Sequence, residues 1–229
     1  MRAREPPLEA MGDAALYADF SGRSEASSGL LPAIAERLRL GAPAWVCDVV
    51  PAIDGIALYF DPLHPELPPD PEPQAASLLA VALRQARGGP SRRVELPVCY
   101  EPEFALDLAE VAEVCALAPE EVVRRHSAGE HRVVMIGFAP GQPYLSGLDR
   151  KLHAAARRPV PRLRVPTGSV AIANGQTSVY PFETPGGWNV IGRTPVRLFD
   201  AARDSPSYLA PGDRVRVVPI SRAEFDRWR

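Results

Sequence analysis

The sequence predicts an α+β protein of two domains, with strands and helices alternating in residues 1–92 and a β-barrel preceded by helices in residues 93–229. Two observations support this division. The chain of 229 residues is long for one domain and long enough for two, because a domain typically has roughly 100–200 residues. Strand and helix signals alternate through the first hundred residues, whereas short apolar runs between Gly and Pro dominate after residue 136.

The first half contains six predicted elements in the order β-α-β-β-α-β. In the first helix, Leu31, Ile34 and Leu38 recur near helical spacing and Gly41 supplies a stop signal. This order is that of a split βαβ, ferredoxin-like sandwich. The elements are a strand at 15–20, a helix at 28–40, strands at 44–50 and 55–60, a helix at 74–87 that ends at Gly88 and Gly89, and a strand at 92–100.

The second half begins with two predicted helices, at 104–117 and 118–130. Pro119 stands at the start of the second helix, and Glu120 and Glu121 fill its first turn, where the helix dipole favours acidic side chains. Eight Gly and eight Pro then occur between residues 136 and 195, interrupted by β-type runs such as "SVAIA" and "WNVIG", and "DRVRVVPI" forms a terminal strand. Short strands separated by turn residues predict a closed or nearly closed barrel.

Composition excludes several classes of function. A net charge of −2 and a pI near 6.1 give no general attraction to nucleic acid or to an anionic membrane. No apolar run approaches the length of a membrane span, and the N-terminal residues lack the apolar core of a signal peptide. The cysteines at 47, 99 and 115 are odd in number and far apart, which is typical of a reducing compartment and predicts a cytoplasmic protein.

The common catalytic motifs are missing from the sequence. No G-x-x-x-x-G-K-[ST] phosphate loop exists, because the only lysine is Lys151. Ser169 follows Gly168 directly, so it does not form a G-x-S-x-G nucleophile elbow. His126 and His131 lie five residues apart, the wrong spacing for two metal ligands on one helix face, and we expect no metal site there. The sequence therefore predicts no self-sufficient catalytic apparatus.

The stretch from Arg164 to Pro195 is the strongest candidate for a functional surface. Gly and Pro fix its backbone, and side chains on such loops can be pre-positioned for a ligand. A purely structural interpretation stays open, in which Gly and Pro form barrel corners, Trp188 belongs to the core and Arg193 pairs with Glu183. Likewise, His126 either caps a helix C-terminus or transfers a proton. The polar and aromatic residues of the stretch include Gln176, Thr177, Tyr180, Glu183, Trp188 and Arg193.

Several long blocks of sequence resemble the allophanate hydrolase subunit 1 family. They include "VVPAIDGIALYFDP", "LPVCY", "EEVVRRHSAGEHRVVMIGFAPGQPYLSGL" and "PRLRVPTGSVAIANGQTSVYPFETPGGWNVIGRTPVRLFD". The resemblance extends from Gly12 to Asp200. It implies an N-terminal ferredoxin-like domain and a C-terminal cyclophilin-like β-barrel.

The resemblance also implies a function: one component, inactive alone, of a multisubunit ATP-dependent 5-oxoprolinase. That enzyme converts 5-oxoproline, ATP and water to glutamate, ADP and phosphate. The implied partners are the A-type component and the C-type component, a second barrel protein, with ATP bound somewhere in the complex. Two alternatives within the resemblance are an inhibitor of a histidine kinase and a component of a urea- or allophanate-type biotin-dependent carboxylase or hydrolase.

The family motifs imply a set of site residues as well. Arg193 or Arg164 would bind a carboxylate, and His126 or Glu183 would transfer a proton. Gln142 and Asn174 depart from the family pattern, which usually has an apolar aromatic residue and Gly at these positions. The binding candidates, for substrate or partner, are Gln142, Tyr144, Arg164, Ser169, Gln176, Thr177, Trp188 and Arg193, and the catalytic candidates are His126 and Glu183.

Overall fold

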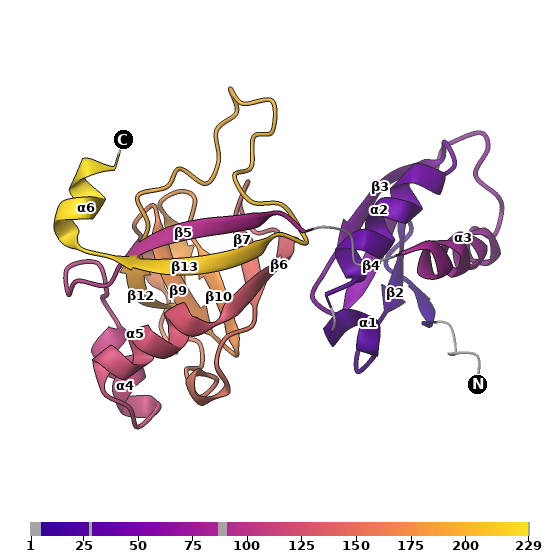
Figure 1. Ribbon diagram of the computed structural model, residues 1–229. Helices are drawn as coiled ribbons and strands as arrows, with labels where there is room; N and C mark the ends of the chain where they lie inside the picture. Colours follow the sequence, from indigo (N-terminus) through magenta and orange to yellow (C-terminus); the bar gives the residue numbers. More distant parts are fainter. Residues whose placement is uncertain (1–5, 28, 87–90, 229) are drawn as a thin grey trace. The chain divides into compact units, whose positions relative to one another are not determined.

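A computed structural model describes residues 6–27, 29–86 and 91–228 (Figure 1). The chain forms two compact units, Met1–Ser91 and Arg92–Arg229. The expected helix stop at residues 88 and 89 lies outside the described residues. Within those ranges, no helix is long and apolar enough to cross a membrane.

The first unit is one antiparallel sheet with two longer helices packed against it. The strand order is β1-β2-β4-β3. Ile34 and Leu38, predicted from helical spacing, are buried with Leu79 and Trp45 in one apolar core. The elements are β1 (Leu8–Ala10), β2 (Ala15–Asp19), α1 (Ser24–Ser27), α2 (Leu31–Gly41), β3 (Val46–Pro51), β4 (Gly55–Phe60) and α3 (Glu72–Gln85).

The sixth element of the predicted ferredoxin-like set exists as a strand, but its assignment to the first domain is wrong. The strand predicted at 92–100 is β5 (Arg93–Cys99), and it pairs in the second unit with β13 (Arg214–Ile220) in parallel and with β12 (Asn189–Arg193). Its place beside β2 is taken by β1, a short strand that local sequence patterns did not predict. The apolar side chains of β5 are buried in the barrel core instead, so residues 6–27 and 29–86 do not by themselves complete a ferredoxin-like set.

The second unit is a closed barrel of seven strands in the order β10-β7-β6-β13-β5-β12-β9, which confirms the predicted barrel. Helices α4 and α5 pack against it (Figure 1). Strands β8 and β11 form a separate two-stranded ribbon. The remaining elements are α4 (Leu108–Val114), α5 (Pro119–Ala128), β6 (Glu130–Ile136), β7 (Pro143–Ser146), η1 (Arg150–Leu152), β8 (Arg162–Val165), β9 (Ser169–Ala173), β10 (Gln176–Val179), β11 (Thr184–Gly186) and α6 (Arg222–Arg227).

Alternate residues of the strands fill the barrel interior. Leu96, Val133, Leu145 and Val170 come from four different strands, and all are fully buried in one cluster. A small barrel packed in this way holds side chains rather than a ligand. Any ligand site must therefore lie at a barrel end or on the outer face.

Helix α4 is shorter than the predicted helix at 104–117. It begins after Asp107, whose backbone N–H donates to the Val190 carbonyl (2.8 Å). It ends at Val114, and Ala116 adopts a left-handed φ of 52° that no helix continues through. Contact with β12 thus sets the start of the helix, which local periodicity does not reveal.

Candidate functional site

A buried polar cluster joins α5 to the barrel strands. His126 is fully buried; its Nδ1 lies 2.6 Å from the Tyr100 hydroxyl and its Nε2 lies 3.2 Å from Thr177 Oγ1. His131 Nε2 donates to the His126 carbonyl (2.8 Å), and the two imidazole rings are 5.1 Å apart. The predicted role of His126 as a C-terminal cap is wrong: it lies in the last turn of α5, but its ring nitrogens face Tyr100 and Thr177 rather than the carbonyls of the helix end. Its predicted role in proton transfer stays a prediction.

Burial controls the protonation of this cluster. Loss of hydration lowers the pKa of the His126 imidazole well below its usual value, and repulsion from His131 lowers it further. Burial also lowers the pKa of His131, although the hydrogen bond to the backbone carbonyl of His126 opposes the shift. The pKa of the Tyr100 hydroxyl is raised by burial. All three side chains are therefore neutral at pH 7.

We expect the second unit to lose stability as the pH falls below about 6.5, the ordinary imidazole pKa. The unfolded chain then binds protons that the folded His126 and His131 exclude, so the free energy of unfolding decreases toward acid. One imidazole contributes at most about 1.4 kcal/mol per pH unit. Urea unfolding followed by the Ile172 amide NMR signal should show a shallower slope between pH 6.5 and 5 in His126→Gln. His64→Gln, in the first unit, is the control, and an unchanged slope in His126→Gln would contradict the assignment.

Arg193 lies at one end of the barrel with its charge unpaired. Its Nε donates to the Thr167 carbonyl (2.8 Å), and its guanidinium carbon lies 5.5 Å from the centre of the Phe104 ring. Among residues 6–27, 29–86 and 91–228, no carboxylate forms an ion pair with it. Its terminal nitrogens are thus available to an anion, and the guanidinium fork matches a carboxylate.

Tight loops surround Arg193 at this barrel end. Ser169 is its direct partner between β9 and β12 and is buried. Gly168 precedes it with φ +82°, and a Cβ there would lie 2.5 Å from the Thr194 carbonyl oxygen, so only glycine fits. The backbone around Arg193 is therefore held rigidly.

Gln142 lies near the same end, where β6, β7 and β10 meet. Its Nε2 donates to Ser178 Oγ (3.1 Å), and its buried Oε1 has no hydrogen-bond partner in the described part of the chain. The preceding loop is strained, with Phe138 exposed at a left-handed φ of 68°. Such strain is typical of functional loops.

The remaining predicted residues lie on the outer face and the ribbon. Tyr144 packs edge-on against Trp188 (5.7 Å between ring centres), and Trp188 is buried as the structural interpretation expected. The expected pair of Arg193 and Glu183 is wrong, because β11 follows Glu183 and pairs with β8, which carries Arg164. Glu183 therefore lies 3.5 Å from Arg164, with side chains 53% and 82% exposed. Gln176, partly exposed, starts β10.

The predicted residues thus form several small groups rather than one pocket. His126 meets Thr177, Tyr144 meets Trp188, Arg164 meets Glu183, and Ser169 is paired with Arg193. Two pockets, of about 550 and 350 Å³, are lined by other residues. No group of three or more His, Cys, Asp or Glu side chains that could hold a metal ion occurs within the described ranges.

Sequence reasoning missed two residues that organise this unit. Tyr100 lies in the "LPVCY" block, and a tyrosine after an apolar strand has a hydroxyl that needs a partner when buried. Asp107 is fully buried and accepts hydrogen bonds from Arg158, Arg162 and the Val190 N–H. The cluster of arginines at 157–164 was the available signal for Asp107.

Comparison with known proteins defines the class of this molecule. The chain belongs to the family described as carboxyltransferase domain, subdomain C and D, whose sequence profile matches residues 6–209. This match confirms the family resemblance, and it covers most of the chain, including most strands of the closed barrel.

Within this family, the chain is similar to proteins named as the B subunit of 5-oxoprolinase. The protein of that name from Bacillus subtilis (strain 168) is 37% identical over 231 residues, which cover 97% of this chain and 96% of the relative. The protein of that name from Escherichia coli O157:H7 is 53% identical over 129 residues, which cover 56% of this chain and 59% of the relative.

A solved structure shows the same fold in a much larger protein. The Kluyveromyces lactis urea amidolyase aligns with 99% of this chain at a TM-score of 0.74, and the chain spans 16% of its length. At 16% identity, this likeness concerns the fold alone.

Proposed function

We propose that this protein is the B subunit of a multisubunit ATP-dependent 5-oxoprolinase, inactive without its partner proteins. The observation that carries the proposal is the match to the B subunit of Bacillus subtilis 5-oxoprolinase over nearly the full length of both chains. The complex would open the lactam of 5-oxoproline to glutamate, with hydrolysis of ATP. We place it in the cytoplasm, in keeping with the number and spacing of the cysteines.

Arg193 is the residue we assign to substrate recognition. 5-Oxoproline carries one carboxylate, and Arg193 presents an unpaired guanidinium beside rigid loops. The Phe104 ring and the Thr167 carbonyl fix its direction, so little conformational entropy is lost when it binds. Arg164 is the less suitable of the two predicted arginines, because Glu183 already lies beside it.

His126 is better suited to positioning than to direct proton transfer. It is fully buried, and its two ring nitrogens face Tyr100 and Thr177. We therefore assign it to holding β10, which carries Thr177 and Ser178, against α5. Glu183 is exposed and remains the candidate for proton transfer to or from a substrate bound near the ribbon. ATP is a substrate of the complex, and we assign it no site on this chain.

Reconstitution tests the proposed function. Glutamate release from 5-oxoproline and ATP should be measured for the chain alone, for the A-type and C-type components without it, and for the mixture. We expect glutamate and ADP in equal amounts only in the complete mixture. A mixture that forms a stable complex but releases no glutamate would refute the proposal.

Carboxyl transfer is the second candidate, and the family description favours it. A biotin-dependent carboxyltransferase would require a biotinylated partner and would consume bicarbonate. The reconstituted mixture distinguishes the two reactions, because lactam hydrolysis proceeds with avidin present and without bicarbonate.

A further inference from the structure

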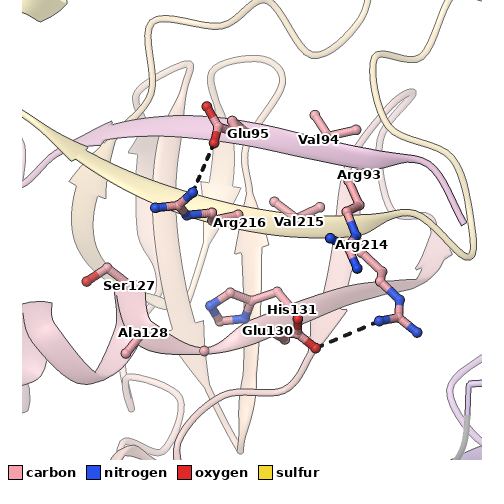
Figure 2. Close-up of a pocket in the computed structure, with 11 residues that line it drawn as sticks. Arg93, Val94, Glu95, Ser127, Ala128, Glu130, His131, Arg214, Val215 and Arg216 are labelled. Carbon is pink, nitrogen blue, oxygen red and sulfur yellow. Dashed lines mark hydrogen bonds and ion pairs between the residues drawn. The ribbon is translucent and has the colours of Figure 1, made fainter.

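Arg193 differs from the paired arginines of the barrel wall in what fixes its direction. Figure 2 shows one of these, Arg216, whose guanidinium lies 3.3 Å from the carboxylate of Glu95. In the part of the chain that the structure describes, no carboxylate lies within ion-pair distance of Arg193. Its Nε donates to the Thr167 carbonyl (2.8 Å), and its guanidinium carbon lies 5.5 Å from the centre of the Phe104 ring. The direction of its terminal nitrogens therefore depends on one hydrogen bond and one aromatic ring.

The Phe104 ring is held in turn by helix α6. Phe225 of α6 packs against it, with the two ring centres 4.5 Å apart and the ring planes tilted by 37°. Arg222, one turn earlier in the same helix, places its guanidinium carbon 4.9 Å from the centre of the Phe104 ring. Ion pairs with Glu103 and Asp226 balance the charge of Arg222. Arg222 therefore fastens α6 to the turn that carries Phe104, and it offers no unpaired charge to an anion.

The sheet brings the start of α6 close to Arg193. Ile220, the last residue of β13, is the direct partner of Cys99 on β5, and Cys99 is the direct partner of Arg193 on β12. Neighbouring strands lie about 4.8 Å apart, so α6 leaves the barrel about 10 Å from the Arg193 backbone. A capping box between Ser221 and Glu224 begins the helix at this point (Figure 1). The path from α6 through Phe104 to Arg193 is therefore short.

We propose that Phe225 is a positioning residue for substrate binding, and that it acts on Arg193 through Phe104. This inference rests on the proposed function, in which Arg193 binds the carboxylate of 5-oxoproline. Ordering a long side chain at the moment of binding costs conformational entropy, and packing on Phe104 orders the guanidinium beforehand. Without Phe225, the Phe104 ring loses the ring that it packs against. Arg193 then samples more directions, and binding of the carboxylate weakens.

Steady-state kinetics of the reconstituted complex test this role. Phe225→Ala is expected to raise KM for 5-oxoproline about three- to tenfold, the size of one aromatic pair interaction. The value of kcat should change less than about twofold, because the carboxylate is bound equally in the ground state and the transition state. Phe225→Tyr keeps the ring and should behave as the wild type does. The matched control is Trp228→Ala, which removes a half-exposed aromatic side chain from the end of the same helix.

Two comparisons distinguish positioning of Arg193 from a general role in folding. Turnover of the carboxamide of 5-oxoproline should not change in Phe225→Ala, because this substrate has no carboxylate for Arg193 to bind. In an Arg193→Ala background, Phe225→Ala should have no further effect, since the two residues act in one chain of contacts. An equal loss for the acid and the carboxamide, or an equal loss in both backgrounds, would overturn the inference.

NMR of the chain without its partners separates this inference from the proposed function. The Nε–H signal of Arg193, assigned by its absence in Arg193→Ala, reports the hydrogen bond to Thr167 and the ring current of Phe104. We expect this signal to shift and broaden in Phe225→Ala, and to stay in place in Phe225→Tyr and Trp228→Ala.

Each combined outcome has one meaning. An unchanged Arg193 signal in Phe225→Ala would overturn the inference even if the wild-type complex is active. A shifted signal together with a wild-type complex that releases no glutamate would overturn the proposed function and support only the positioning of Arg193 by α6. If Phe225→Ala detaches α6 as a whole, Phe225→Leu keeps the apolar packing and tests the aromatic ring alone.

Discussion

Arg193→Ala is expected to lower kcat/KM for 5-oxoproline about 30-fold or more in the reconstituted complex. Truncating one member of a hydrogen-bonded charge pair costs about 2–5 kcal/mol, and about 1.4 kcal/mol corresponds to a factor of ten in rate. The barrel should remain folded, because the Arg193 side chain donates one hydrogen bond, to Thr167, and otherwise rests on Phe104. Arg193→Lys should recover only part of the activity, since an ammonium lacks the planar fork.

The substrate provides the matched test of this assignment. The carboxamide of 5-oxoproline lacks the carboxylate, so the wild-type complex should turn it over poorly. Arg193→Ala should lower that rate little further, because the partner of the arginine is already absent. Arg124→Ala, exposed on α5, controls for general loss of positive charge. If Arg193→Ala reduces the turnover of 5-oxoproline and of its carboxamide equally, Arg193 does not bind the carboxylate.

Local patterns in the sequence identify most strands and helices but not their partners. The spacing of Ile34 and Leu38 predicts α2 because one face of that helix is apolar. The apolar alternation of β5 predicts a strand equally well. Its partner strand β13, however, is distant in the sequence: the paired residues Glu95 and Arg216 are 121 positions apart. The assignment of β5 to the second unit depends on its pairing with β13 and β12 in the closed barrel, which local patterns do not show.

The candidate site shows the same limit. His126 and Thr177 are both polar residues in family blocks, but they lie 51 positions apart, and they meet only because the barrel brings Thr177 of β10 to the buried His126 in the last turn of α5. Glu183 and Arg193 show the converse: they are close in the sequence but do not form the expected pair. Proximity in sequence favoured it, whereas the ribbon of β8 and β11 directs Glu183 to Arg164. The strands and helices that carry these residues were therefore predictable, and the groups that the residues form were not.

Asp107→Ala is expected to destabilise the second unit by about 3–5 kcal/mol, the cost of breaking a buried ion pair from one side. The fully buried carboxylate accepts from Arg158 at 2.5 Å and from Arg162 at 2.7 Å through two guanidinium nitrogens. It also accepts from the Val190 N–H at 2.7 Å. Removal leaves two guanidinium groups and one buried N–H without this acceptor. Urea unfolding, followed by amide signals of β9 and β12, measures the loss.

Glu110→Ala is the matched control for this variant. Glu110 also lies beside Arg158, at 2.8 Å, but its side chain is 65% exposed, so its loss should cost no more than about 1 kcal/mol. Asp107 connects the start of α4, strand β12 and the arginine-rich segment that leads into β8. Its removal should therefore also lower the activity of the complex, through movement of the ribbon that carries Glu183. Equal stability losses in Asp107→Ala and Glu110→Ala would show that burial of the Asp107 carboxylate contributes nothing special to this unit.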